Sequence, residues 1–270
     1  VATNATTDGS IQVMGSESPA LAAPGEPMFF MVYYQKLASE QRNLYGSVQL
    51  IDSVGQKLGQ VDQALGTGSF PDYPYSEWRL DEVVRDQFLL FAPNDIVTPA
   101  VLDVLMVVYD RDTGERIAET WLSPVAITTI AQATIPSTAV RLEHSVGLVE
   151  LLAADTRLAA DQLEITLYWQ VADAVPVDGV VFIHLYDGAG NFVQGNDSEP
   201  LGGRYPMSVW QPGETIVDEH RFVVSVLARG AYSVHAGIYD PITGERFPIT
   251  APNGQRVLND SLEIGQVQIP

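Results

Sequence analysis

The sequence predicts an all-β protein of two tandem β-sandwich domains. Three observations support this prediction: apolar residues recur with a period of two, turn signals follow one another at short spacing, and several sequence blocks occur twice in the same order. No window shows a sustained helical period. The 22 glycines and 17 prolines fit a chain of short strands joined by tight turns, and the hydrophobic content of 46% is that of a folded globular protein.

The strand pattern is clearest in the second half of the chain. The apolar positions there are Leu163, Ile165, Leu167 and Trp169, and they alternate with Glu164, Thr166, Tyr168 and Gln170. The corresponding apolar positions of the first half are Met28, Phe30, Val32 and Tyr34. Because successive side chains of a strand point to opposite faces, this alternation predicts strands with one buried face. Residues 180–186 and 232–239 predict two further strands.

Two sequence blocks occur twice. Tyr-Asp-x-x-Thr-Gly-Glu-Arg stands at 109–116 and again at 239–246, and Tyr-Pro-x-Ser-x-Trp stands at 73–78 and again at 205–210. After the second block, Glu82 and Asp86 correspond to Glu214 and Asp218. The shift between copies changes only from block to block, as expected when loops vary in length and strands do not.

The repeat defines the predicted domain organisation. We expect an N-terminal tail at 1–8, a first domain at 9–130, a linker at 131–140 and a second domain at 141–270. The linker contains Pro136 and small polar residues, which suit a connection between domains. The two domains should superpose, with Trp78 on Trp210 and Tyr109 on Tyr239.

Turn signals such as Asp187-Gly188, Gln211-Pro212-Gly213 and Pro252-Asn253-Gly254 separate the predicted strands. About seven short strands in each domain fit an immunoglobulin-like or fibronectin-like β-sandwich. Gly230-Ala231-Tyr232 also resembles the start of a late immunoglobulin-type strand, where a tyrosine commonly ties the corner. The first copy has Ala100-Val101-Leu102 at that place and lacks the tyrosine.

The second copy carries further blocks in a fixed order. They are Trp169-Gln170, Phe182 to Asp187, Gly202 to Pro206, Trp210 to Glu214, Gly230 to Tyr232, and Gly237 to Arg246. Over most of 145–250 this series resembles the extracytoplasmic β-sandwich appended to bacterial membrane glycosyltransferases of the protein-mannosyltransferase type, a module also found in other surface proteins. The first copy departs from the pattern at Leu80-Asp81, where the second has Pro212-Gly213. The resemblance implies a location outside the cytoplasmic membrane and an accessory role, without the chemistry of the transferase.

The charge balance excludes one broad class of partner. Lys and Arg number 14 against 34 Asp and Glu, which gives a formal net charge of −20. Such a field repels a phosphate backbone, so we expect no nucleic-acid partner. The longest apolar runs, 28–34 and 104–109, are far shorter than the roughly 20 residues of a membrane helix, so we expect no membrane insertion. The absence of cysteine removes disulfides, thiolate zinc sites and cysteine nucleophiles.

The sequence contains no motif of a catalytic or cofactor site, and we predict no enzyme, no catalytic residues and no cofactor. Nucleophile-elbow, His-Glu-x-x-His, phosphate-loop and dinucleotide patterns are all absent. Asp110, Asp112 and Glu115 are spaced like the opening of a calcium loop, but Gly114 and Trp121 occupy positions where ligands would be needed. We favour a hairpin without a metal there, and the negative charge leaves loosely bound calcium elsewhere as an open alternative.

All four histidines lie in the second half, which argues against a metal site shared by both copies. His184 and His235 belong to predicted strands and could face each other on one sheet. We favour packed sheet histidines over a pair of metal ligands.

The Tyr-Pro-x-Ser-x-Trp block supports two interpretations. If Tyr73, Trp78, Tyr205 and Trp210 were exposed, they would form a platform on which sugar rings stack. If the tryptophans were buried, they would fill the sandwich core while the proline and serine shape the loop. We favour burial, and the exposure of the two indoles separates the interpretations.

The outer strand faces differ between the copies. On one strand, Phe29, Met31 and Tyr33 of the first copy replace Glu164, Thr166 and Tyr168 of the second. On another, Leu105 and Val107 replace His235 and Gly237. A third strand reverses the trend, with Ser47, Gln49 and Ile51 in place of Phe182, His184 and Tyr186. Contiguous apolar side chains usually mark contact surfaces, so we predict that the five apolar residues of the first copy lie in an interface. We also expect residues 1–8 to be ordered by packing, as a strand added to a neighbouring sheet.

These observations lead to two functional hypotheses. The first is a non-enzymatic structural or adhesive protein of the cell surface or extracellular space, which assembles with itself or with other surface components into a layer or filament. The second is a carbohydrate-binding accessory module whose partner is a polysaccharide.

Overall fold

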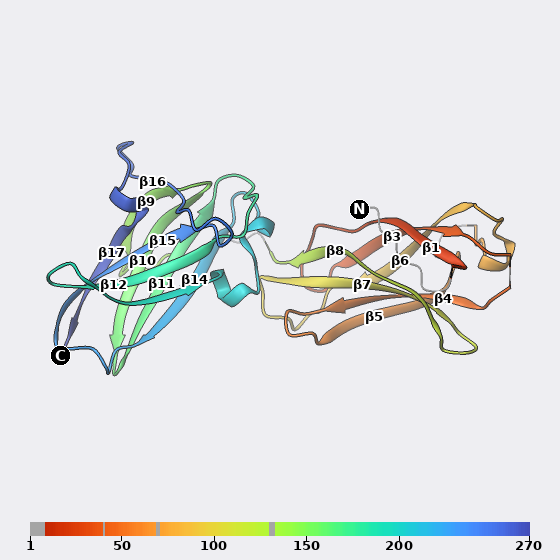
Figure 1. Ribbon diagram of the computed structural model, residues 1–270, viewed down its shortest axis with the longest axis horizontal. Coiled ribbons are helices and arrows are strands. Elements are labelled where there is room, and N and C mark those ends of the chain that lie inside the picture. Colours follow the sequence, from red (N-terminus) through yellow and green to blue (C-terminus); the bar gives the residue numbers. More distant parts are fainter. Residues whose placement is uncertain (1–8, 40, 69–70, 130–132) are drawn as a thin grey trace. The chain divides into compact units, whose positions relative to one another are not determined.

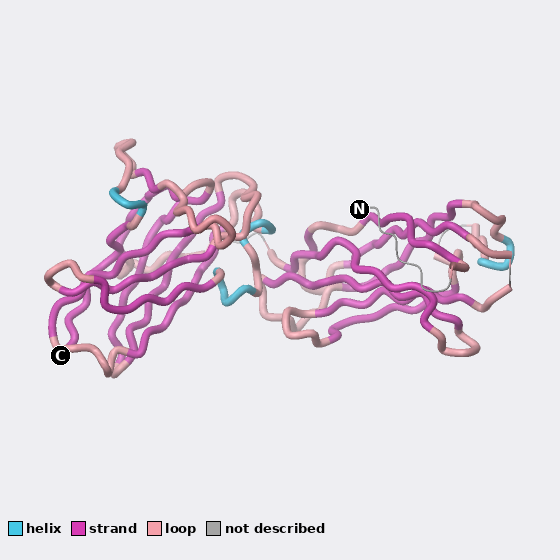
Figure 2. Tube along the Cα trace, in the orientation of Figure 1, coloured by secondary structure: helices cyan, strands magenta, loops and turns pink. Residues whose placement is uncertain are grey.

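The computed structural model describes residues 9–39, 41–68, 71–129 and 133–270 of the chain. Strands dominate this part of the chain, and its helical segments are short 3-10 turns, as Figure 2 shows. None of the described helices is long and apolar enough to cross a membrane. The chain divides into two compact units, Val1–Thr129 and Ile130–Pro270, which we call the first and second domain. The predicted all-β class is confirmed.

Two sheets form the first domain (Figure 1). The three-stranded sheet has the order β1 (Ile11–Glu17), β3 (Pro27–Lys36) and β6 (Val83–Phe91). The five-stranded sheet has the order β2 (Leu21–Ala22), β8 (Arg116–Ile127), β7 (Ala100–Asp110), β4 (Leu44–Ile51) and β5 (Lys57–Ala64). Neighbouring strands are antiparallel except β2 and β8, which are parallel. The 3-10 turn η1 (Tyr75–Glu77) lies between β5 and β6.

Two sheets also form the second domain. One has the order β14 (Thr215–Val223), β11 (Gln162–Val171), β10 (Val149–Ala159), β9 (Val140–Val146) and β16 (Ile249–Thr250). The other has the order β13 (Phe192–Ser198), β12 (Val180–Asp187), β15 (Gly230–Tyr239) and β17 (Leu262–Ile269). The 3-10 turns are η2 (Pro200–Gly203), η3 (Met207–Val209) and η4 (Leu258–Asp260).

The two domains share one pairing order. The order β1-β3-β6 recurs as β10-β11-β14, and the order β8-β7-β4-β5 recurs as β17-β15-β12-β13. The repeated sequence blocks lie on equivalent elements, since Tyr109 and Tyr239 are near or at the ends of β7 and β15, while Trp78 and Trp210 directly follow η1 and η3. The duplication seen in the sequence is therefore a duplication of topology.

Alternating side chains build each core, as their spacing predicts. Met28, Phe30, Val32 and Tyr34 on β3 are at most 1% exposed, and so are Leu163, Ile165, Leu167 and Trp169 on β11. The hydroxyl of Tyr232 donates a hydrogen bond to the backbone oxygen of Ala228 at 2.8 Å. This bond ties the start of β15 to the preceding turn, in the manner expected of a corner tyrosine.

The described part of the predicted linker, residues 133–140, belongs to the second domain and packs against it. Ile135 and Ala139 pack with Tyr168 and Val217 on the outer side of the sheet that contains β11 and β14. Tyr168 is consequently only 6% exposed although it points away from the core. The physical reason is that an apolar side chain in a connecting segment gains free energy by covering an adjacent apolar sheet face.

The repeated Asp-x-x-Thr-Gly-Glu-Arg blocks form matching turns. The carboxylate of Asp110 accepts the backbone N–H of Asp112 at 2.9 Å, and that of Asp240 accepts the backbone N–H of Ile242 at 2.7 Å. Gly114 and Gly244 have φ values of 74° and 73°, a left-handed conformation that glycine adopts without strain. This geometry agrees with the turn interpretation, in which the aspartate oxygens cap backbone groups.

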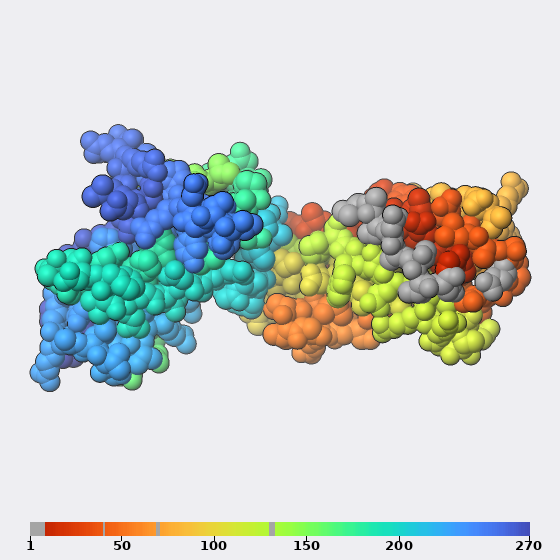
Figure 3. All heavy atoms as spheres, in the orientation of Figure 1, coloured from red at the N-terminus to blue at the C-terminus, as the bar shows by residue number. Residues whose placement is uncertain are grey.

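After this turn the domains diverge. In the first domain the chain enters β8 at Arg116, whereas in the second domain residues 247–261 make an excursion through β16 and η4 before β17. Figure 3 shows these residues, in dark blue, projecting from the surface of the second domain. We call residues 247–261 the excursion. It gives the second domain a surface feature that the first domain lacks.

Gly237 on β15 provides a test of how tightly the outer side of the second domain is packed. A Cβ atom at this position would lie 2.5 Å from the Phe182 ring and 2.9 Å from the backbone oxygen of Asp260. We expect Gly237→Ala to lower the free energy of unfolding by about 1–3 kcal/mol, because the added methyl group overpacks this contact. Urea denaturation followed by tryptophan fluorescence measures the change.

Gly188→Ala is the matched control, since a Cβ at Gly188 meets no heavy atom within 4 Å. Equal stability of the two alanine variants would contradict the packing described.

Candidate functional site

A buried network surrounds the second Tyr-Pro-x-Ser-x-Trp block. The indole N–H of Trp210 donates to the backbone oxygen of Tyr205 at 2.9 Å, and the Tyr205 hydroxyl donates to Oε2 of Glu214 at 3.0 Å. The same carboxylate oxygen accepts the backbone N–H of Gln211 at 3.1 Å. Tyr205, Trp210 and Glu214 are 0%, 2% and 3% exposed. These contacts hold the loop before β14 against the core.

The first domain repeats this network atom for atom. The Trp78 indole donates to the backbone oxygen of Tyr73 at 2.6 Å, the Tyr73 hydroxyl donates to Oε2 of Glu82 at 2.8 Å, and the Arg79 N–H donates to the same oxygen at 2.8 Å. The Arg79 N–H and the Tyr73 hydroxyl together lower the pKa of Glu82, and the bond to Glu82 raises the pKa of Tyr73. Trp78 is 4% exposed, while Tyr73 is half-buried.

The predicted burial of both tryptophans is confirmed, and it bears on the sugar-platform interpretation. A stacking platform needs a ring face open to solvent, and Trp78, Tyr205 and Trp210 offer none. Tyr73 is partly accessible, but its hydroxyl is engaged by Glu82. The block is thus a structural device of the fold in both domains.

A second repeated device is a buried aspartate on the edge strand that follows this loop. Asp86 accepts the backbone N–H groups of Gly66 and Gly68, each at 2.9 Å, and Asp218 accepts the N–H of Leu201 at 2.9 Å. Asp86 and Asp218 are 0% and 1% exposed. Each carboxylate satisfies backbone donors that would otherwise be buried without a partner.

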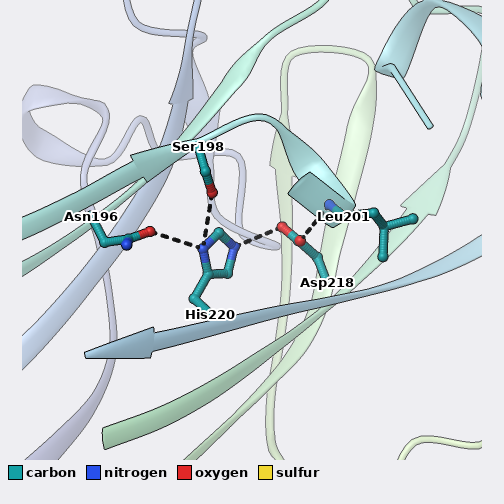
Figure 4. Close-up of polar contacts among 5 residues, drawn as sticks. All are labelled: Asn196, Ser198, Leu201, Asp218 and His220. Carbon is teal, nitrogen blue, oxygen red and sulfur yellow. Dashed lines mark hydrogen bonds and ion pairs between the residues drawn. The ribbon is translucent and has the colours of Figure 1, made fainter. Parts of the chain in front are cut away.

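Figure 4 shows that Asp218 also holds His220, at the side of the sandwich where β13 meets β14. Nε2 of His220 lies 2.8 Å from Oδ2 of Asp218, while Nδ1 lies 3.4 Å from the Ser198 hydroxyl and 3.5 Å from the Asn196 amide oxygen. The order serine, histidine, aspartate is that of a nucleophilic triad. The sequence analysis did not single out His220, and the correspondence of Asp218 with Asp86 was the available signal.

Comparison with the first domain indicates that the cluster of Ser198, Asp218 and His220 is structural. Asp86 holds the same loop there, and the position that corresponds to His220 is Phe88, a core residue that is 0% exposed. A histidine that replaces a core phenylalanine needs polar partners, and Asp218 with Ser198 provides them. The geometry is therefore explained by satisfaction of a buried histidine, without a reacting group.

The outer face of β12, β13 and β15 in the second domain carries a layer of aromatic rings. His184 and His235 are direct register partners, which confirms that they face each other on one sheet. The Tyr186 ring lies 4.9 Å from His235 and 6.0 Å from Phe192, and His184 lies 5.0 Å from Phe192 (centroid distances). We call these four residues, together with Phe182 at 4.8 Å from His184, the aromatic layer.

Hydrogen bonds and partial burial determine the protonation of the two histidines. Burial lowers the pKa of His184, against the opposing effect of Asp197, whose Oδ1 is 3.2 Å from Nε2. Burial also lowers the pKa of His235, against the opposing effect of Glu263. Both rings are therefore neutral near pH 7 and can each donate and accept a hydrogen bond.

A pocket of about 350 Å³ opens where the aromatic layer meets the excursion. Its floor includes Tyr186, Ser233 and His235 from the sheet, and its wall includes Arg246, Asn259 and Ser261. Pockets of small-molecule sites begin at about 300 Å³ and combine aromatic rings with a few polar groups. The predictions of glycan contact did not name these residues, because the pocket needs two strands and a distant turn to meet.

The predicted interface residues of the first domain have different environments. Phe29 is 48% exposed, and Met31, Tyr33 and Leu105 are partly buried. Val107 is 3% exposed and does not belong to an exposed face, because it lies on the central strand β7 between Ser47 and Glu119 of the adjacent strands. The Tyr33 hydroxyl donates to Oε1 of Glu17 at 2.6 Å.

Strand pairing places two further exposed apolar residues next to Phe29, which the sequence comparison did not identify. Leu89 of β6 is the register partner of Phe29, and Phe91 is the partner of Pro27; Leu89 and Phe91 are 41% and 61% exposed. We call Phe29, Leu89 and Phe91 the apolar patch. The expectation for residues 1–8 lies outside the described residues.

Among the residues that the structure describes, no group of three His, Asp or Glu side chains is placed to hold a metal ion. No protein-family model matches the chain, and a search of curated proteins finds no match either. The assignment of function therefore depends on the geometry of this molecule.

The duplicated network predicts unequal effects of one substitution in the two domains. Tyr205→Phe removes a hydrogen bond to the fully buried Glu214, so we expect the free energy of unfolding to fall by about 1.5–3 kcal/mol. Tyr73→Phe should cost less, because water can replace the hydroxyl at the half-buried Glu82. Chemical denaturation of both variants measures the difference, and a larger loss for Tyr73→Phe would contradict the network.

Proposed function

We propose that the chain is a non-enzymatic, extracytoplasmic protein with a structural or adhesive role, in which two immunoglobulin-like sandwiches present binding surfaces. The observation that carries this proposal is a contrast between the domains. What they share is scaffold: the pairing order, the buried tryptophans and the carboxylates that cap loops. What differs is the outer surface, where the second domain has the aromatic layer and the excursion.

The non-enzymatic role is supported by the use of the polar groups. Glu82, Glu214, Asp86 and Asp218 each accept backbone N–H groups, and His220 is satisfied by Asp218. A general base needs a lone pair directed at a substrate, and these groups direct oxygen or nitrogen lone pairs at partners within the fold. The extracytoplasmic location follows from the resemblance of the second domain to surface modules.

Binding to the cell envelope tests the adhesive role. We expect the fluorescently labelled chain to bind insoluble envelope polymers saturably, and Tyr186→Ala to weaken that binding, because Tyr186 lines the pocket beside the aromatic layer. Ile51→Ala is the matched control, since Ile51 is the corresponding residue of the first domain. Binding that does not saturate, or release of soluble fragments from the polymer, would contradict a non-enzymatic adhesive role.

Self-assembly is a second candidate function, and the apolar patch favours it. Exposed Phe29, Leu89 and Phe91 lie together on β3 and β6, and β6 is an edge strand of its sheet. Exposed apolar side chains on an edge strand favour association between copies. A surface layer or filament is the assembly that we propose for this face.

Sedimentation velocity at high protein concentration, with and without calcium, tests self-assembly. We expect concentration-dependent association that Phe29→Asp abolishes, because a charge in the apolar patch must be desolvated on contact. Val226→Asp is the control, since Val226 is 81% exposed outside the patch. A wild-type chain that stays monomeric under both conditions would rule out this second function.

A further inference from the structure

We propose that the pocket of the second domain binds a neutral hexopyranose unit of a carbohydrate, with the sugar ring against Tyr186 and its hydroxyl groups among the polar side chains of the wall. This inference rests on the proposed adhesive function and names the ligand class of its surface. It concerns a different place in the fold from the Tyr-Pro-x-Ser-x-Trp block, whose aromatic rings are largely buried.

The floor of the pocket offers an oriented aromatic ring. Tyr186 is held between His235 and Phe192, with both contacts in T-shaped geometry, so its plane is constrained before a ligand arrives. Tyr186 is partly exposed, and it lines the pocket. The electron-rich face of an aromatic ring attracts polarised C–H groups, which a pyranose ring presents on its apolar side.

The polar groups around this ring suit a ligand rich in hydroxyls. Ser233 and Ser261 contribute hydroxyls that both donate and accept, and Asn259 contributes an amide that does the same with two groups. Within the described part of the chain, the Ser233 hydroxyl and the Asn259 amide make no hydrogen bond. Nδ1 of His235 lies 3.5 Å from the Ser261 hydroxyl, so the wall and the floor are linked.

The acidic groups around the pocket and the net charge of the chain disfavour an anionic ligand, although Arg246 lines the pocket. The Arg246 guanidinium lies 4.3 Å above the Phe182 ring and donates to the backbone oxygen of Asn259 at 2.9 Å, which fixes it as part of the wall. Asp197 and Glu263 lie beside the two histidines of the aromatic layer. The chain as a whole carries a net charge of −20, which repels anionic sugars at a distance.

The wall of the pocket is rigid, which lowers the cost of binding. Asn259 and Asp260 have φ values of 59° and 47°, two consecutive left-handed residues that are not glycine. The Asp260 carboxylate stabilises this conformation, since it accepts the N–H of Ile249 at 2.9 Å and pairs with Nη2 of Arg256 at 2.7 Å. Backbone strain that the surroundings maintain is typical of ligand-binding sites, and a preformed wall loses little entropy on binding.

The described residues of the first domain contain none of these parts. Ile51 and Leu105 occupy the positions of Tyr186 and His235, and the chain passes from the turn directly into β8. The site is therefore specific to the second domain, which gives an internal comparison for the experiment.

Calorimetric titration and saturation-transfer NMR of the whole chain test the proposal, with neutral gluco-, manno- and galacto-oligosaccharides of three or four units as probes. A uronic acid oligosaccharide of the same length is the anionic comparison. We expect saturable binding of at least one neutral oligosaccharide, weakened about tenfold or more by Tyr186→Ala. Tyr186→Phe keeps the ring and should retain most of the affinity, and Ile51→Ala should have no effect.

Each other outcome decides against the inference. Binding of the uronic acid oligosaccharide alone would overturn the neutral ligand class, and binding that Tyr186→Ala leaves unchanged would overturn the site. If the chain binds envelope polymers but no oligosaccharide, the adhesive function stands and the sugar site fails. Circular dichroism of each variant separates loss of binding from loss of fold. Asn259→Gly, which removes the amide and tolerates the positive φ of this position, should also weaken binding while leaving the aromatic layer intact.

Discussion

The fold depends on the contacts that stabilise the segment crossing from one sheet to the other, between β5 and β6 in the first domain and between β13 and β14 in the second. In each domain the chain leaves an edge strand of one sheet, β5 or β13, and enters an edge strand of the other, β6 or β14. Where this segment passes over the side of the sandwich, the N–H groups of Gly66 and Leu201 are buried or half-buried and need acceptors. Asp86 and Asp218 provide them, together with Glu82 and Glu214. A buried carboxylate is costly on its own. Several N–H groups offset that cost at Asp86, and the Leu201 N–H together with His220 offsets it at Asp218.

The two tryptophans also stabilise the crossing segment. Trp78 and Trp210 fill the space under the crossing segment, and each indole N–H is bonded to the backbone oxygen of the tyrosine that starts the block. The carboxylates and the indoles thus hold the segment from its two ends. This arrangement explains why these residue types recur in both copies while the loops between them differ in length.

Because buried carboxylates and indoles stabilise each sandwich, the residues on its outer surfaces can differ between the copies. The outer surface of the second domain differs on β12, β13 and β15, where glycines make room for large rings: a Cβ at Gly237 on β15 would meet Phe182, and a Cβ at Gly195 on β13 would meet His184. The first domain has instead exposed apolar side chains on β3 and β6. The two copies therefore differ where they meet solvent and agree where they meet their own core.

The sequence by itself determined the all-β class, the duplication and the inward residues of β3 and β11, because periodicity and repeated blocks can be read along the chain. It favoured burial of Trp78 and Trp210, which the tertiary structure then decided. It did not predict that Ile135 packs on Tyr168, that Val107 is buried, that Leu89 and Phe91 extend the patch of Phe29, or that His220 joins Asp218. It also gave no sign of the pocket between Tyr186 and Asn259. These features depend on strand register and on contacts between segments far apart along the chain, and only the tertiary structure decides which distant residues meet.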